Sequence, residues 1–267
     1  KFPPRRLLWI GLGFFLVPVV LDLLFAFTMP YWPEESVTGT MQNWKLEGAA
    51  LEHYLSAYRG SWLEQMHVRV PGYLFMQTGY FFMYSFWRVM AMMLLGMALF
   101  KWKVLSATLS RSRYLRLGLI ALLLGLLLSG TGVVLNFKNQ WSMEFSMFLG
   151  KQFNYLGSVG TALGYVGLVM LICKSDFFRR CKATFSAVGR MAFSNYILMT
   201  LICTFLFYGH GLGWFGSVER TYQALIVLGI WIVILVISPL WLRSFRLGPL
   251  EALWRSLTYA SWQSLKK

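Results

Sequence analysis

The chain has 267 residues, of which 57% are hydrophobic, 18% are aromatic and only 13% are charged. Because soluble globular domains carry about 25% charged residues, this composition excludes a disordered chain, a secreted disulfide-rich scaffold and an ordinary soluble enzyme. The net charge of +15 comes without a recognisable nucleic-acid-binding module, so we expect no nucleic-acid partner.

Six apolar stretches are each long enough to cross a bilayer as a helix, which takes about 20 residues. In chain order they cover residues 7–28, 73–100, 115–137, 148–173, 191–209 and 222–242. The second stretch exceeds that length, which predicts that it tilts or begins in the interface. We therefore predict an all-α, polytopic membrane protein that forms one membrane-embedded domain over residues 1–267.

Charges in the connections predict the orientation of these spans. Basic residues gather at the amino end and after the second, fourth and sixth stretches, whereas the other three connections are poor in them. The two internal basic connections contain Lys101, Lys103, Arg111, Arg113 and Arg116, and then Lys174, Arg179, Arg180, Lys182 and Arg190. Cytoplasmic loops carry an excess of Lys and Arg, so this alternation places both termini in the cytoplasm.

Two stretches outside the spans have an apolar face at helical spacing, which predicts helices that lie on the membrane surface. The first apolar face consists of Leu51, Leu55, Tyr58, Trp62 and Met66. The second begins after the start signal Gly248-Pro249 and consists of Leu250, Leu253, Trp254 and Leu257. On the polar side of the second helix, Glu251 and Arg255 have the spacing of an i,i+4 ion pair.

The second span contains one arginine, Arg88, near its middle. A charge at this depth is costly unless it finds a partner. Asp22 is the only acidic residue in the six stretches and is the expected partner, although the two differ in depth by roughly 10 Å at about 1.5 Å per residue. Two interpretations stay open, namely a structural ion pair and a contact with a substrate inside the membrane.

The fourth span carries glycines at spacings of three, four and three residues, which places them on one helix face. They are Gly157, Gly160, Gly164 and Gly167. Small residues let helix backbones approach closely in a membrane. This face therefore predicts a packing surface for a neighbouring helix or for a second copy in a homo-oligomer, and a substrate groove is the alternative.

All three histidines, His53, His67 and His210, lie on the predicted outer side. Histidine is the usual general base near neutral pH, and Glu64 lies about one helical turn before His67. His67 and His210 are therefore candidate catalytic residues, and ordinary surface histidines are the alternative. We expect no metal site, because no cluster has the spacing of metal ligands.

The inner end of the fifth span, residues 189–196, reads GRMAFSNY and follows a basic connection. A helix amino end with basic neighbours can bind an anion. The candidate ligands for the phosphate of a cytosolic donor or a lipid head group are Arg179, Arg180, Lys182 and Arg190. Ser194 and Asn195 lie about one turn deeper, where buried polar groups need partners. Positive-inside charge combined with hydrogen bonds between helices is the alternative.

Three segments resemble the YeiB-like family of bacterial inner-membrane proteins, a DUF418-type family of unknown function. GRMAFSNY at 189–196 is similar to the family's GRMALTNY signature, and GPLEALWRSLTY at 248–259 is similar to its closing GPLEWLWRSLTY stretch. Arg88 followed by MMLLGM at 92–97 is similar to its RxxxMMLLGM helix. The differences are small, such as Phe193 for Leu and Ala252 for Trp.

The resemblance implies the bacterial inner membrane and a distant relationship to transmembrane acyltransferases, which often take an acyl group from cytosolic acyl-CoA. No cofactor motif is evident. The resemblance implies acyl-CoA as a donor substrate, and membrane lipids are the expected partners. The alternatives are a small-solute transporter that uses Arg88 and Asp22, and a structural or accessory subunit. Similar family members begin with further helices and an LDxxRGxAxxGI-like motif, so we expect this chain to be the carboxy-terminal portion of a longer protein.

Overall fold

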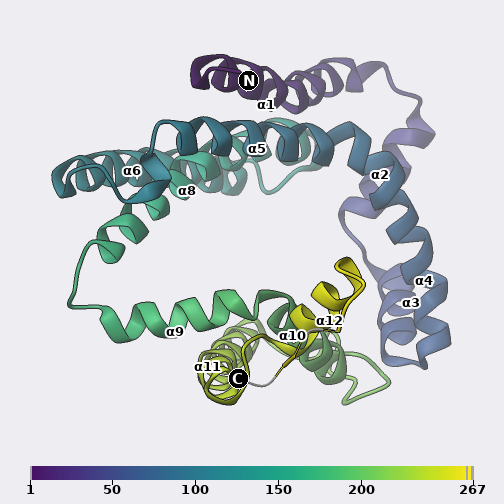
Figure 1. Ribbon diagram of the computed structural model, residues 1–267. Helices are drawn as coiled ribbons and strands as arrows, with labels where there is room; N and C mark the ends of the chain where they lie inside the picture. Colours follow the sequence, from purple (N-terminus) through teal and green to yellow (C-terminus); the bar gives the residue numbers. More distant parts are fainter. Residues whose placement is uncertain (1, 263, 266–267) are drawn as a thin grey trace. The chain divides into compact units, whose positions relative to one another are not determined.

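The computed structural model describes residues 2–262 and 264–265 (Figure 1) and contains helices but no β-strand among these residues. The helices form two compact units. Unit 1 comprises Lys1–Glu47 and Gly72–Asp176, and unit 2 comprises Gly48–Pro71 and Phe177–Lys267. The all-α class predicted from composition is confirmed, and the single domain over residues 1–267 stays a prediction.

Five of the six predicted spans are helices that are long and apolar enough to cross a membrane. Three are single helices, namely α1 (Pro4–Thr28), α6 (Arg111–Lys138) and α11 (Arg220–Ser244). The span Trp62–Lys101 consists of α4 (Trp62–Phe75), the π-helical segment η2 (Met76–Ser85) and α5 (Phe86–Lys101). The span Met143–Cys173 consists of α7 (Met143–Phe145), the π-helical segment η4 (Ser146–Gly150) and α8 (Lys151–Cys173).

The fifth predicted span differs from the structure. The basic connection before it is not a loop but the helix α9 (Arg179–Arg190), followed after Met191 by α10 (Ala192–Phe207). The two helices are bent by 78° and are long enough to cross a membrane only as a pair. With 16 residues, α10 alone is about 24 Å long, which is shorter than a typical hydrocarbon core.

The amphipathic stretch predicted as one helix over residues 51–66 is divided into α3 (Gly48–Arg59) and the start of α4. The break follows Gly60, where Ser61 and Glu64 form a capping box. The Ser61 N–H donates to Glu64 Oε2 at 2.6 Å, and the Glu64 N–H donates to Ser61 Oγ at 3.4 Å. The Ser-x-x-Glu pattern of this capping box is present in the sequence at residues 61–64. It marks the start of α4 at Trp62.

The second predicted amphipathic helix is confirmed as α12 (Pro249–Thr258), with Gly248 at its amino-terminal cap. The structure adds three short elements that the apolar pattern does not reveal. They are η1 (Met29–Tyr31), α2 (Glu34–Trp44) and η3 (Val104–Ser106).

In unit 1, α8 lies beside α6 (Figure 1). The face of α8 that contacts α6 is its glycine face. A Cβ atom built on Gly167 would lie 2.6 Å from Gly118 Cα, and one built on Gly160 would lie 3.0 Å from Gly125 Cα. The backbones of the two helices are therefore in direct contact, as expected where small residues meet in a membrane protein. The helix-packing interpretation of this face is thus the one that the structure supports, with α6 as the neighbouring helix.

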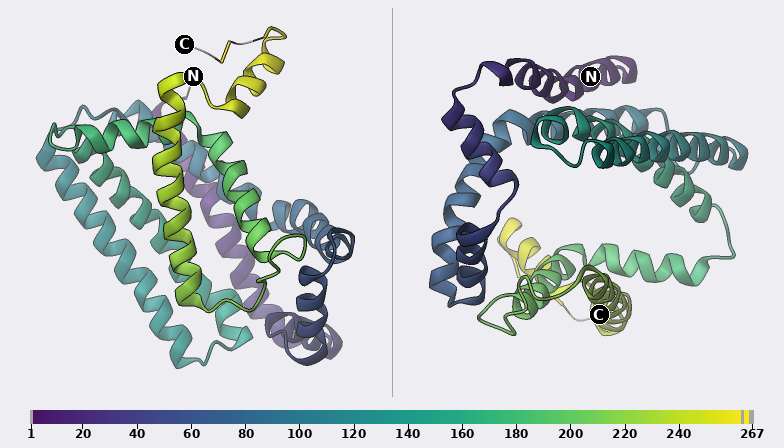
Figure 2. Two further views of the ribbon diagram at one scale, coloured as in Figure 1. Left: turned by 90° about the horizontal axis from the view of Figure 1, so that it is seen from below. Right: turned by 180° about the vertical axis from the view of Figure 1, so that it is seen from behind.

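In unit 2, the bent pair α9 and α10 packs against α11 (Figure 2). Ala187 of α9, Met191 at the bend and Leu242 of α11 form a buried apolar cluster. The short helix α12 contacts α10. The GRMAFSNY segment and the closing GPLEALWRSLTY segment therefore meet in this unit.

Candidate functional site

A groove of about 520 Å³ lies between α9, α10 and α11 in unit 2. Its walls are mainly apolar. They include Phe185 and Val188 of α9, Ala192 and Met199 of α10, and Trp231 and Ile234 of α11. Asn195 contributes the polar side chain to this lining. The size and lining fit an apolar ligand whose orientation is fixed by few polar groups.

Asn195 links the three helices that form the groove. Its Nδ2 atom donates to the Ser238 hydroxyl of α11 at 3.0 Å and to the Val188 carbonyl of α9 at 3.2 Å. Both side chains are buried, with 4% of Asn195 and none of Ser238 exposed. A buried polar pair that is satisfied in this way fixes the positions of its helices. One interpretation of the sequence was that Asn195 forms hydrogen bonds between helices, and the structure contains such bonds.

The amino end of α10, which the sequence predicted as an anion site, is occupied by a carboxylate of the chain itself. Glu251 of α12 accepts hydrogen bonds from the N–H groups of Phe193 and Ser194, at 2.8 and 3.0 Å. The Ser194 hydroxyl donates to the same carboxylate at 2.5 Å. Negative charge is favoured at a helix amino end, so Glu251 binds here. It forms no ion pair with Arg255 among the described residues, contrary to the i,i+4 expectation.

Replacement of Glu251 by Ala is expected to lower the free energy of unfolding by about 2 kcal/mol, because it removes three hydrogen bonds to a charged acceptor. The measurement is unfolding of the purified full-length protein in mixed micelles with increasing dodecyl sulfate. Arg255→Gln is the matched control on the same helix, since Arg255 is exposed. Equal stability of the two variants would contradict this role of Glu251.

The basic residues predicted to bind a donor phosphate lie on α9 and at its end. Arg179 and Arg180 are exposed in the first turn of α9. Arg190, in the last turn, donates from Nη2 to the Arg246 carbonyl at 2.6 Å, and Lys182 also has an interaction partner. The helix contains four basic residues and no acidic one. Among the described residues, no basic side chain lines the groove, and Arg190 follows the lining residue Gly189 directly in the sequence.

Arg88 lies in α5 of unit 1 and is half-buried. Its Nη2 atom donates to the Ser158 hydroxyl of α8 at 2.9 Å, and its guanidinium carbon lies 4.5 Å from the centre of the Tyr155 ring. Its side chain also interacts with that of Tyr84. Within unit 1, the described residues give Arg88 no ion pair.

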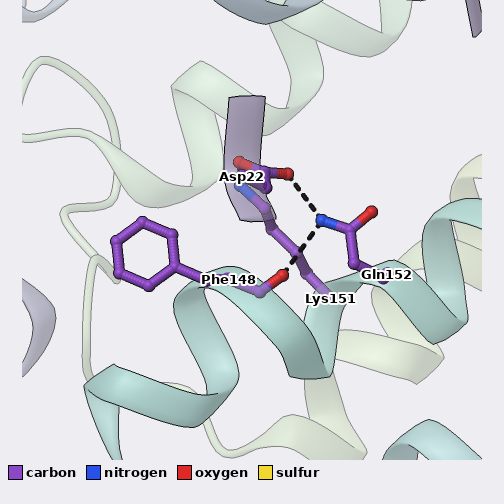
Figure 3. A network of polar contacts seen from close by, with 4 residues as sticks. All are labelled: Asp22, Phe148, Lys151 and Gln152. Atoms are coloured by element: carbon purple, nitrogen blue, oxygen red, sulfur yellow. Dashed lines mark hydrogen bonds and ion pairs between the residues drawn. The ribbon is translucent and has the colours of Figure 1, made fainter. Parts of the chain in front are cut away.

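The expected ion pair between Arg88 and Asp22 is therefore wrong. Asp22 binds Lys151 and Gln152 instead (Figure 3). The Lys151 Nζ atom lies 2.7 Å from Asp22 Oδ1, and Gln152 Nε2 donates to Asp22 Oδ2 at 2.6 Å and to the Phe148 carbonyl at 2.9 Å. Lys151, at the start of α8, contacts Asp22 directly, whereas residue counting along the two spans gives Asp22 and Arg88 a difference in depth of roughly 10 Å.

Two of the three histidines line one cavity in unit 2. His53 of α3 borders a cavity of about 320 Å³ together with Glu64 and His67 of α4. The Glu64 Oε2 atom is engaged in the capping box described above, and the cavity is lined by both imidazoles beside this carboxylate. The third histidine, His210, follows α10, and its ring lies 5.8 Å from that of Tyr208. In the described part of the chain, no group of three or more His, Cys, Asp or Glu residues has a metal-binding arrangement.

Comparisons with known proteins match more than half of the chain. A family profile described as "Protein of unknown function (DUF418)" matches residues 99–261. The uncharacterised protein YxaH of Bacillus subtilis (strain 168) is 38% identical over 170 residues, which are 61% of this chain and 40% of YxaH. The uncharacterised protein YeiB of Escherichia coli (strain K12) is 34% identical over 172 residues, which are 64% of this chain and 44% of YeiB.

A third relative is an uncharacterised 39.9 kDa protein from the amylase 3′ region of Bacillus acidopullulyticus, which is 29% identical over 128 residues. The alignment covers 48% of this chain and 35% of that protein. The chain thus spans less than half the length of the relatives that it matches. No solved structure matches it significantly.

Proposed function

The chain belongs to the DUF418 family of proteins of unknown function, and from this premise we propose that it transfers an acyl group from cytosolic acyl-CoA to a lipid or envelope acceptor in the bacterial inner membrane. The observation that carries the proposal is the apolar groove between α9, α10 and α11, one wall of which is a helix, α9, that also carries four basic residues. An acyl-CoA molecule has the matching combination of an apolar chain and a polyanionic head.

The groove is the proposed site of the acyl chain. Its apolar lining gains free energy by removing methylene groups from water, at about 0.8 kcal/mol for each one that is buried. Asn195 lines the groove, but both hydrogens of its Nδ2 atom are donated to Ser238 and Val188. Its proposed role is therefore to fix the three helices that form the walls of the groove, and it has no further N–H donor for a thioester carbonyl.

The CoA phosphates are proposed to bind the exposed Arg179 and Arg180 on α9, with Arg190 nearer to α10. Arginine suits this role because its planar guanidinium donates two parallel hydrogen bonds to a phosphate. The amino end of α10 is not part of this proposed phosphate site, because the Glu251 carboxylate accepts its N–H groups.

Transfer requires a base, since the acceptor hydroxyl or amine loses a proton as it attacks the thioester carbon and CoA leaves as the thiolate. His67 and His210 are the candidate bases in this chain. Of the two, His67 shares a cavity with a second imidazole, that of His53. The acceptor is proposed to approach from the predicted outer side, where the sequence places both histidines.

The test is the rate of acyl transfer by the purified full-length protein in vesicles of Escherichia coli polar lipid, with radiolabelled palmitoyl-CoA as donor. Ala192→Trp places an indole in the groove and is expected to raise KM for palmitoyl-CoA by about tenfold, since it displaces several methylene groups. The KM for acetyl-CoA should change much less, because its acyl group is too short to fill the groove.

Leu201→Trp is the matched control, because Leu201 is on the same helix and exposed but does not line the groove. The double substitution Arg179→Gln, Arg180→Gln should weaken the binding of palmitoyl-CoA and of acetyl-CoA to the same extent, because both carry the same CoA phosphates. If the wild-type protein neither binds nor turns over acyl-CoA, the proposal is wrong.

A further inference from the structure

Arg88 forms the centre of a polar cluster in unit 1 that no step of the proposed acyl transfer uses. We infer that this cluster binds the negatively charged oxygen group of an amphiphile, either a lipid phosphate or a fatty-acid carboxylate. The inference rests on the charge balance of the cluster, on how firmly Arg88 is held and on its depth. None of the cluster's residues lines the groove in unit 2.

Among the described residues of unit 1, the charge balance of the cluster leaves one positive charge, that of Arg88, without an acidic partner. Arg88 and Lys151 both interact with Tyr84, and the Lys151 Nζ atom lies 5.2 Å from its ring centre. Asp22 supplies the negative charge of the cluster. It forms an ion pair with Lys151, whose Nζ atom lies 2.7 Å from Asp22 Oδ1. A guanidinium inside an apolar span needs a counter-charge or water, and a bound anion supplies it.

The guanidinium is held in one position. Tyr155 is 2% exposed, is stacked on Phe15 with ring centres 4.6 Å apart, and donates from its hydroxyl to the Phe15 carbonyl at 3.0 Å. This fixed ring lies beneath the guanidinium of Arg88, 4.5 Å away. Ser158 accepts from Arg88 and donates to the Tyr155 carbonyl at 2.9 Å. The site is therefore organised before a ligand arrives, which lowers the entropic cost of binding.

The hydrogen-bonding capacity of Arg88 is not exhausted. Arginine has five N–H donors in a planar fork, and the described contacts of Arg88 use one for Ser158 and an interaction with Tyr84. The remaining donors match the two oxygens of a carboxylate or phosphate. The Tyr84 hydroxyl adds a neutral donor beside them.

The depth of Arg88 favours an amphiphile over a water-soluble anion. It lies thirteen residues before Lys101, the basic end of the span, which is about 20 Å along a helix. Its neighbours along α5 are exposed apolar residues, including Val89 and Met93, with 52% and 59% of their surfaces exposed. A ligand with an acyl chain can cover this apolar surface while its anionic group contacts Arg88.

The experiment measures the thermal unfolding midpoint of the delipidated full-length protein in detergent as a function of added amphiphile. The probes are dioleoyl phosphatidate, oleate and the neutral dioleoylglycerol. Both anionic probes, or one of them, should raise the midpoint in a saturable manner, because a ligand that binds the folded state stabilises it. A response to phosphatidate alone identifies a lipid phosphate, and a response to oleate alone identifies a carboxylate.

Arg88→Gln should lower the affinity for the effective probe by about tenfold or more. This is the effect expected when a pair of charge-assisted hydrogen bonds is lost. Arg116→Gln is the matched control, an exposed arginine of the same unit, and should leave the affinity unchanged. Ser158→Ala releases one contact of Arg88 without removing charge and should weaken binding by a smaller factor, which keeps the test decisive if Arg88→Gln does not fold. Equal affinity in wild type, Arg88→Gln and Ser158→Ala, or equal binding of dioleoylglycerol, would overturn the inference.

Discussion

Replacement of Gly125 by Ala is expected to lower the free energy of unfolding by about 3 kcal/mol, one of the largest effects available in unit 1. A Cβ atom at this position would lie 2.7 Å from the Gly157 carbonyl oxygen and still closer to the Thr161 backbone nitrogen. Both obstacles are part of the α8 backbone, which no side-chain rotation can move. The two helices would have to separate, and the close packing along the interface would be lost.

Gly130→Ala is the matched control, because Gly130 is in the same helix and a Cβ atom there meets nothing within 4 Å. This substitution should be neutral or stabilising by up to about 1 kcal/mol, since alanine is the better helix former. The measurement is unfolding of the full-length protein by dodecyl sulfate in mixed micelles. Equal stability of the two variants would show that the glycines do not set the distance between α6 and α8.

The contact between α6 and α8 shows how far the sequence predicts the fold. The glycine face of α8 was recognisable from spacings of three and four residues. Its counterpart on α6 consists of Gly118, Gly125 and Gly132 at intervals of seven, a period that also repeats one helix face. The signal for the partner helix was present in the sequence, but a search for short spacings does not detect it.

The boundaries of the third and sixth spans were predictable because the hydrocarbon core imposes a length on each apolar run. Residues 115–137 and 222–242 lie inside α6 and α11, which extend one to four residues further at each end. The second span begins at Trp62 rather than at residue 73, because the amphipathic helix α4 continues into it. The helical state of α9 was not predictable from the same argument. Four basic residues suggested a cytoplasmic loop by charge alone, although no proline interrupts the segment and arginine and lysine are good helix formers.

The side-chain contacts of the candidate sites were the least predictable part. Sequence separation gave no reason to bring Glu251 to Ser194, which are 57 positions apart. The elementary argument that an anion is favoured at a helix amino end was correct for α10. It could not decide whether that anion is a donor phosphate or a carboxylate of the chain, because the choice depends on how α12 packs.

Removal of the negative charge by Asp22→Asn is expected to lower the free energy of unfolding by about 2 kcal/mol, somewhat less than for a fully buried pair. The Asp22 side chain is 8% exposed and that of Lys151 is 37% exposed, so water compensates Lys151 in part. The substitution leaves two positive groups, Lys151 and Arg88, around Tyr84 with no acid between them. The loss of the 2.7 Å ion pair between Asp22 and Lys151 (Figure 3) lowers the stability. The repulsion between Lys151 and Arg88 lowers it further.

The double variant Asp22→Asn, Lys151→Gln separates charge pairing from packing. If Asp22 serves to neutralise Lys151, the double variant should recover about 1 kcal/mol or more of the stability lost in Asp22→Asn, because no unpaired ammonium remains. Gln152 can still donate to the side-chain amide oxygen that replaces the carboxylate, so its hydrogen bond is retained. Unfolding in mixed micelles at low and high salt gives the measurement. A double variant no more stable than Asp22→Asn would show that the carboxylate acts through Gln152 and the η4 backbone rather than through the lysine.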